Sequence, residues 1–205
     1  MTSILKVDEL QDTSGNLIIK EDSNTITIGA SGDTTNIIGT LQNNGAAVGG
    51  LSMADQWRLT ANATGGSADI TSNWERNDST GFGQLGTGMT ESSGVFTFPS
   101  TGIYLVSFGA SFYNSTADSR FNRANIKVTT DNSSYTTVAR GVASHNVIAS
   151  SFTYSGAFTQ YQLDVTDTSN VKVMFNRDVQ DNDTYIEGDT SINKVFMTFI
   201  RLGDT

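Results

Sequence analysis

The segment 103–113 constrains the fold of this chain more than any other part of the sequence. It reads IYLVSFGASFY, and every second residue is apolar: Tyr104, Val106, Phe108, Ala110 and Phe112. In an extended strand these residues lie on one face. From Ile103 to Ser111 the opposite face begins apolar and ends in small residues, which is typical of a strand that is closely approached at one end. The segment therefore predicts a strand with a buried face.

Further strands are readable along the rest of the chain. They are expected near 96–98, before the turn 99–102; on both sides of the hairpin turn 131–134; and at 152–158, 161–165, 171–175 and 195–202. Several short strands separated by turns predict a sandwich or a barrel. The last strand is apolar on both faces, so we expect it in the middle of a sheet or at a subunit contact.

Composition supports an all-β chain. It has 20 Gly, one Pro and no segment rich in Ala, Glu, Lys and Leu that would form a long helix. We expect residues 51–205 to form one domain. The large apolar residues of its core or of a subunit interface are predicted to be Phe96, Phe98, Tyr104, Val106, Phe108 and Phe199.

Residues 13–50 have a different pattern, in which short segments of β-branched residues alternate with polar turn clusters. The apolar residues of these short segments include Ile18, Ile26, Ile28 and Ile37. Such short strands cannot cover each other's apolar faces within one chain, so we predict a thin shaft of intertwined chains that ends in a flexible joint. The alternative is a disordered tail, because Asn, Ser, Thr and Gly dominate.

Residues 1–12 form a short amphiphilic segment without a core of its own. Its apolar residues Ile4, Leu5, Val7 and Leu10 are interleaved with charged ones. It has neither the basic and apolar regions of a signal peptide nor a run of apolar residues long enough to span a membrane. We expect neither export by a signal peptide nor insertion into a membrane.

Charge and cysteine content exclude several classes of function. The net charge is −9, which argues against a nucleic-acid partner, because binding to phosphates depends on clustered Lys and Arg. Cysteine is absent, which excludes thiol redox chemistry, thiolate metal sites and a disulfide scaffold.

No constellation predicts catalysis. The chain has a single histidine, His145, and no HExxH, P-loop, dinucleotide fingerprint or Gly-x-Ser-x-Gly elbow before a helix. A Ser/His hydrolase is the enzymatic alternative, and a histidine in a loop or in a hydrogen-bonded position is the favoured interpretation. We therefore expect a protein that is not an enzyme and has no cofactor.

The best metal candidate is the acidic stretch that contains Asp178, Asp181 and Asp183. Calcium takes several carboxylate and carbonyl oxygens from one loop. The spacing is not that of an EF-hand, and a solvated hairpin loop is the simpler interpretation.

Four aromatic residues are candidates for stacking on sugars if they are exposed: Trp57, Trp74, Tyr113 and Tyr154. In strands, Trp and Tyr are more often partly buried core residues with a hydrogen-bonded tip.

The segment 94–108, GVFTFPSTGIYLVSF, resembles the signature of the complement-type globular head domain in the tumour-necrosis-factor-like jelly-roll superfamily. The segments 161–173 and 195–200 are similar to that family's later strands, although Thr166 replaces a glycine that commonly precedes the aspartate there. The resemblance implies a jelly-roll head that trimerises through the flat faces of its sheets and presents loops to ligands. Some family members hold calcium near the trimer axis, which keeps the acidic stretch as a candidate site beside the solvated loop.

The opening residues, MTSILKVDELQD followed by SGNL, resemble the start of structural fibre proteins of marine bacteriophages. A phage fibre is made in the reducing cytoplasm of the host bacterium and needs no signal peptide and no cysteine. We therefore predict an all-β virion protein with an attachment segment (1–12), a shaft and joint (13–50) and a trimeric jelly-roll head (51–205).

The expected partners are a second and third copy of the chain, other virion proteins at the N-terminus, and a host-surface glycan or protein at the head. The alternative function is a capsid decoration or cement protein that stabilises the shell or a vertex. A glycan-cleaving enzyme would need two facing carboxylates, and the sequence fixes no such pair.

Overall fold

The computed structural model describes residues 9–22, 25–29, 31–38, 42–43, 46–47, 50–148 and 151–205. The chain divides into two compact units, residues 1–50 and 51–205. All regular elements in the described residues are β-strands, and no helix there is long and apolar enough to cross a membrane.

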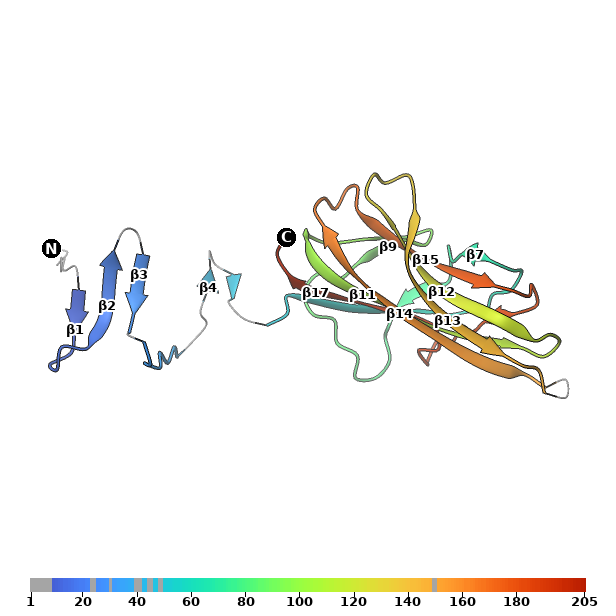
Figure 1. Ribbon diagram of the computed structural model, residues 1–205, viewed down its shortest axis with the longest axis horizontal. Coiled ribbons are helices and arrows are strands. Elements are labelled where there is room, and N and C mark those ends of the chain that lie inside the picture. Colours follow the sequence, from blue (N-terminus) through green and yellow to red (C-terminus); the bar gives the residue numbers. More distant parts are fainter. Residues whose placement is uncertain are drawn as a thin grey trace. The chain divides into compact units, whose positions relative to one another are not determined.

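The first unit contains two small antiparallel sheets. β1 (Glu9–Gln11), β2 (Leu17–Asp22) and β3 (Thr25–Ile28) form one sheet in the order β1-β2-β3 (Figure 1), and β4 (Gln42–Asn43) pairs with β5 (Ala46–Ala47). Asp12 closes the turn between β1 and β2, because its Oδ1 accepts hydrogen bonds from the backbone of Ser14 and Asn16 at 2.8 and 2.9 Å. The Asn16 side chain and backbone hold the pKa of Asp12 below its usual value.

The sheet β1-β2-β3 has no buried side. The isoleucines predicted to form the core of the shaft are exposed within one chain: Ile18 by 42%, Ile26 by 68%, Ile28 by 56% and Ile37 by 48%. Leu10 of the predicted attachment segment is exposed as well. The other attachment residues, Ile4, Leu5 and Val7, lie outside the described residues. Ile18 therefore lies on β2 and Ile26 and Ile28 lie on β3, but the strand expected around Ile37 is not formed, since residues 31–38 contain no strand. One chain leaves all four side chains uncovered.

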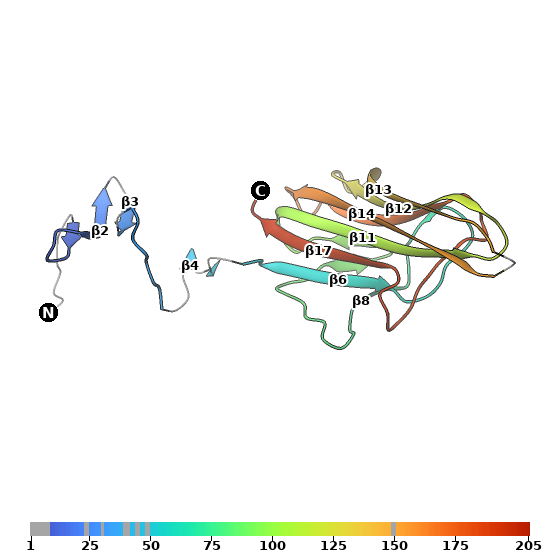
Figure 2. The same cartoon turned by 60° about the horizontal axis from the view of Figure 1, so that its bottom comes forward.

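The second unit, which we call the head, is a sandwich of two sheets. One sheet has the order β13-β12-β15-β10-β9, with β7 paired to β15; the other has the order β14-β11-β17-β6-β8, with β16 paired to β11. Figure 2 shows β14, β11, β17 and β6 side by side in the second sheet. The bounds of the head strands are β6 Met53–Leu59, β7 Ala68–Asp69, β8 Trp74–Arg76, β9 Thr90–Ser92, β10 Val95–Thr97, β11 Gly102–Asn114, β12 Ser119–Thr129, β13 Thr136–His145, β14 Thr153–Val165, β15 Lys172–Val179, β16 Tyr185–Ile186 and β17 Phe196–Gly203.

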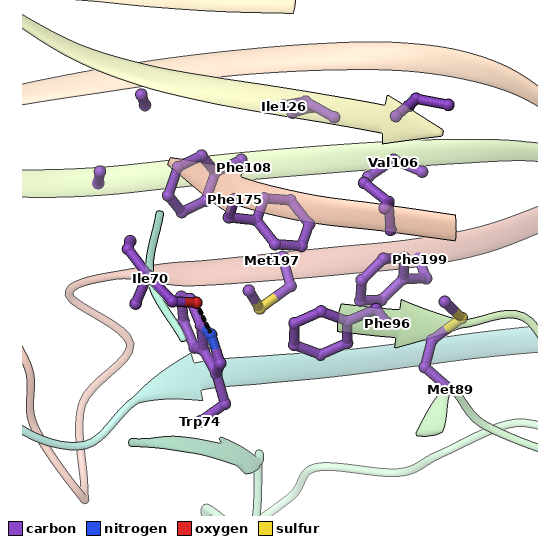
Figure 3. Close-up of a cluster of buried hydrophobic side chains, with 14 of the residues drawn as sticks. Ile70, Trp74, Met89, Phe96, Val106, Phe108, Ile126, Phe175, Met197 and Phe199 are labelled. Atoms are coloured by element: carbon purple, nitrogen blue, oxygen red, sulfur yellow. Dashed lines mark hydrogen bonds between the residues drawn. The ribbon is translucent and has the colours of Figure 1, made fainter. Parts of the chain in front are cut away.

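The core of the head lies between the two sheets and is rich in aromatic rings (Figure 3). Phe96 is central: its ring centroid lies 5.5 Å from those of Phe175 and Phe199 and 6.0 Å from that of Trp74. The Trp74 indole N–H donates to the backbone oxygen of Ile70 at 2.9 Å. Edge and tilted ring contacts of this kind add to the free energy gained by burying the rings.

The six residues predicted for the core or a subunit interface all belong to this core. Phe96, Tyr104, Val106, Phe108 and Phe199 are fully buried, and Phe98 is 2% exposed. The sandwich of one chain thus covers these six residues, as expected for residues of the core.

The strand order explains the pattern of the last strand. β17 lies between β11 and β6, in the middle of its sheet. Its inward residues, such as Phe199, face the core, and its outward residues are partly apolar too. The strands predicted at 152–158 and 161–165 are one continuous strand, β14, because Thr159 and Gln160 favour no turn and continue the pairing with β11.

Candidate functional site

The outer face of the β14-β11-β17-β6 sheet is the main candidate site. Since the even-numbered residues of β11 from Tyr104 to Phe112 face the core, the odd-numbered ones face away from it. Phe158 on β14, Gly109 on β11 and Phe196 on β17 are cross-strand neighbours on this side, and so are Leu105 and Ile200. We call these five residues the outer apolar face.

The outer apolar face is only partly covered within one chain. Phe158 is 54% exposed, and Phe196 and Ile200 are half-buried. β14 is the edge strand of its sheet. On a folded monomer, a contiguous apolar area of this kind marks an interaction surface.

A hollow of about 260 Å³ opens on this face between β14, β11 and β17. Its lining includes Gly109, Gly156, Phe158 and Phe196. A Cβ atom at position 109 would lie 2.8 Å from the Phe196 ring, whereas one at position 156 would meet nothing within 4 Å. Gly109 therefore lets the Phe196 ring lie close to β11, and Gly156 leaves the space beside it open.

An ion pair lies at the rim of the hollow. Lys194 Nζ donates to Glu187 Oε1 at 2.7 Å, and this hydrogen bond raises the pKa of Lys194. Ser111 Oγ donates to the other oxygen of the same carboxylate, Oε2, at 2.9 Å. Glu187 is thereby held in place by two partners on the polar side of an apolar opening.

The end of the same sheet carries a second feature, a row of tyrosines across three strands. Tyr154 on β14 pairs with Tyr113 on β11, which pairs with Tyr185 on β16. The rings of Tyr113 and Tyr185 are stacked at 4.8 Å with an interplanar angle of 4°, and Phe152 meets Tyr113 edge-on at 5.2 Å. We call these four residues the aromatic cluster. Burial, followed by the charge of Tyr185, raises the pKa of Tyr113.

The acidic residues predicted to bind calcium do not form one site. Asp178 on β15 accepts a hydrogen bond from Arg123 on the paired strand β12 at 2.8 Å, and Asp181 accepts one from Asn114 at 3.0 Å, whereas Asp183 is exposed. Across the described ranges, no group of three or more His, Asp or Glu side chains is placed to hold a metal ion. The predicted convergence is wrong, because the sheet register gives Asp178 a cationic partner that sequence spacing does not reveal.

His145 lies in a polar cluster inside the head. Its Nδ1 is 3.0 Å from the side-chain amide nitrogen of Asn122, which donates to it, and 3.5 Å from Ser155 Oγ. Because Nδ1 acts as the acceptor, the ring proton is assigned to Nε2. Ser119 Oγ also donates to Asn122. The histidine is thus part of a buried hydrogen-bonded network, as the favoured interpretation of the sequence supposed.

The tryptophans considered for sugar stacking pack into or against the core, Trp74 buried and Trp57 half-buried. Trp74 is 9% exposed, and Trp57 packs edge-on against Phe96 at 5.4 Å. By contrast, Tyr154 is 57% exposed and Tyr113 lies in the aromatic cluster. Sequence reasoning did not single out Gly156, Phe158 or Tyr185 for a site, since their significance depends on which strands are neighbours in the sheet.

The comparisons with known proteins concern the fold of the head. No protein-family model matches the sequence, and no curated protein sequence matches it. Among solved structures, Eiger TNF from S. frugiperda is similar with a TM-score of 0.54 and 15% identity over 76% of this chain and 95% of that chain. Murine APRIL is similar with a TM-score of 0.52 and 10% identity over 73% and 98%. The head has the jelly-roll fold of these structures. At these identities the likeness extends to the fold alone.

Proposed function

We propose that this protein is a homotrimeric fibre or spike of a bacteriophage virion, which docks on the particle by its N-terminal segment and binds the host surface through its head. The observation that carries the proposal is that each unit leaves apolar strand surface uncovered in a single chain. In the first unit this surface consists of the exposed isoleucines of β2 and β3, and in the head it is the outer apolar face.

Trimerisation accounts for both surfaces at once. The outer apolar face lies on a sheet that ends in the edge strand β14, and it contains a hollow that an aromatic side chain of a neighbouring copy would fill. Each Å² of apolar surface that is removed from water contributes roughly 25 cal/mol. The complement-type resemblance of the segment 94–108 supports three copies rather than two.

The phage-fibre part of the proposal is supported by the opening segment 1–17 and by the arrangement of the chain. A thin sheet without its own core precedes a jelly-roll head. In a trimer, three weak binding sites act together, which raises the avidity for a surface without new contacts at any one site.

Electron microscopy of phage particles labelled with gold-conjugated antibody against the head tests the location. We expect gold at projecting tail or vertex fibres. Gold spread over the whole shell, together with particles that burst more easily when the protein is missing, would identify a decoration protein instead. Particles without gold would show that the protein is not part of the virion.

A further inference from the structure

The aromatic cluster borders a second hollow, of about 340 Å³, whose lining combines rings with polar groups. Tyr113, Tyr185 and Phe152 supply the rings, and the polar side comes from the loop 114–116 and from Asp183. The outer apolar face lacks this combination of rings and free polar groups. The hollow is therefore suited to a ligand that has both apolar faces and hydrogen-bonding groups.

The position of this hollow is fixed by the register of the sheet. β6, where the head begins, starts at Met53, which pairs with Arg201, and Arg201 pairs with Tyr104 near the start of β11. Tyr113 lies near the opposite end of β11, a strand of 13 residues. At a rise of about 3.3 Å per residue, the two ends are roughly 40 Å apart. The aromatic cluster thus lies at the end of the head farthest from the point where the chain enters it.

The rings present accessible surface. Phe152 is 58% exposed and Tyr154 is 57% exposed, and both contact Tyr113, at 5.2 and 5.6 Å between ring centroids. Tyr113 is fixed from the other side by its stacked partner Tyr185. Exposed rings held by ring contacts bind with little loss of side-chain entropy, because they already occupy one orientation.

Polar groups at the hollow are free to bind. The Asp183 carboxylate, the Tyr185 hydroxyl and the Ser115 hydroxyl have no hydrogen-bond partner within the described part of the chain. The Tyr113 hydroxyl accepts a hydrogen bond from Asn62 at 3.0 Å, which leaves its own proton available to a ligand. Asp183 is held at the rim because its backbone N–H donates to Asp181 at 2.9 Å.

We propose that this hollow binds a neutral saccharide of the host surface. The C–H faces of a sugar ring pack against aromatic rings, and its neighbouring hydroxyls donate to a carboxylate and to phenol oxygens. A neutral sugar is favoured over an acidic one, because the Asp183 carboxylate lines the site and the chain carries a net charge of −9. This inference rests on the proposed attachment function and specifies where and what the head binds.

The test uses the full-length chain, cells of the host bacterium, and neutral polysaccharide extracted from those cells. Phe152→Ala removes a ring, and Asp183→Asn removes the acceptor charge. Tyr135→Ala is the matched control, since Tyr135 lies in the β12–β13 turn of the other sheet. We expect each site variant to bind cells and polysaccharide roughly tenfold more weakly, and the control to bind like the parent protein. The solution mass should be the same for all.

Other outcomes separate the saccharide site from the proposed function. If the parent protein binds cells, but periodate oxidation of the cells and both site variants leave binding unchanged, the saccharide site is overturned and host attachment stands. Binding that protease treatment of the cells abolishes would indicate a protein receptor and overturn the saccharide site. A parent protein that does not bind host cells would overturn both proposals. If the solution mass of Phe152→Ala is lower than that of the parent protein, the rings form a subunit contact, which overturns the saccharide site.

Discussion

The two units of this chain use similar strands but differ in what covers them. In the head, a second sheet buries rings such as Phe96 completely, whereas in the first unit Ile26 on β3 is 68% exposed although its strand is paired. Backbone pairing therefore forms sheets in both units, but only the head has a core within one chain. The difference teaches that strand periodicity predicts which apolar side chains need to be buried. It does not predict whether the same chain or another one buries them.

The largest expected effect is the loss of a core ring in the head. Phe96→Ala should lower the free energy of unfolding of the head by about 3–5 kcal/mol, because it removes a large side chain and leaves a cavity. Denaturant unfolding followed by tryptophan fluorescence checks this, since Trp57 and Trp74 both contact Phe96. Ile26→Ala is the matched control in the first unit. An equal loss in both variants would contradict the difference between the units.

A smaller effect is expected where the two sheets approach each other at their edge. A Cβ atom at position 141 on β13 would lie 2.7 Å from the backbone carbonyl carbon of Phe158 on β14. Gly141→Ala should therefore destabilise the head by about 1–3 kcal/mol, because the backbone must shift. Gly83→Ala meets open space, lies outside the outer apolar face and serves as the control in the same unfolding measurement. Equal stability of the two variants would disprove the close approach.

The next prediction concerns the outer apolar face. If assembly covers Phe158, the unfolding midpoint of the parent protein should rise with protein concentration, because association stabilises the folded state. Phe158→Glu should weaken that dependence and leave a folded head. Leu85→Glu is the control, because Leu85 is an exposed apolar residue outside the four strands. In this variant the unfolding midpoint should still rise with protein concentration. A midpoint of the parent protein that does not change with concentration would rule out linked assembly.

The smallest expected effect is on acid stability. The backbone N–H groups of Ser134 and Ser133 hold the pKa of Asp131 below its usual value in the folded head. This stabilisation is complete above about pH 4 and is lost as the pH falls and the carboxylate is protonated. Asp131→Asn should make the unfolding free energy less dependent on pH below about pH 4. Thermal melts of both proteins at several acidic pH values measure the slope, and identical slopes would remove Asp131 as its cause.

The sequence predicts the interior of the head well, because alternation within one strand is a local signal. The residues from Tyr104 to Phe112 and the turn at 131–134 need no knowledge of strand neighbours. The hollow between Gly109 and Gly156 does need it, since these residues are far apart in the chain and are brought together by the pairing of β11 with β14.

The wrong metal prediction has the same origin. Asp178 lies opposite Arg123 through the pairing of β15 with β12, and no spacing within the acidic stretch reveals that partner. The aromatic cluster could be predicted only in part. Tyr113 and Tyr154 stand out in the sequence as candidates for stacking on sugars, whereas Tyr185 joins them only because β16 pairs with β11. Residues that act together across strands are therefore the part of a β protein that local sequence patterns miss.

The most direct test of the central claim is the solution mass of the full-length chain, measured by light scattering during size-exclusion chromatography. The account predicts three times the 21.9 kDa mass of one chain, because assembly covers both the isoleucines of the first unit and the outer apolar face of the head. A mass equal to one chain, at every concentration measured, would contradict it.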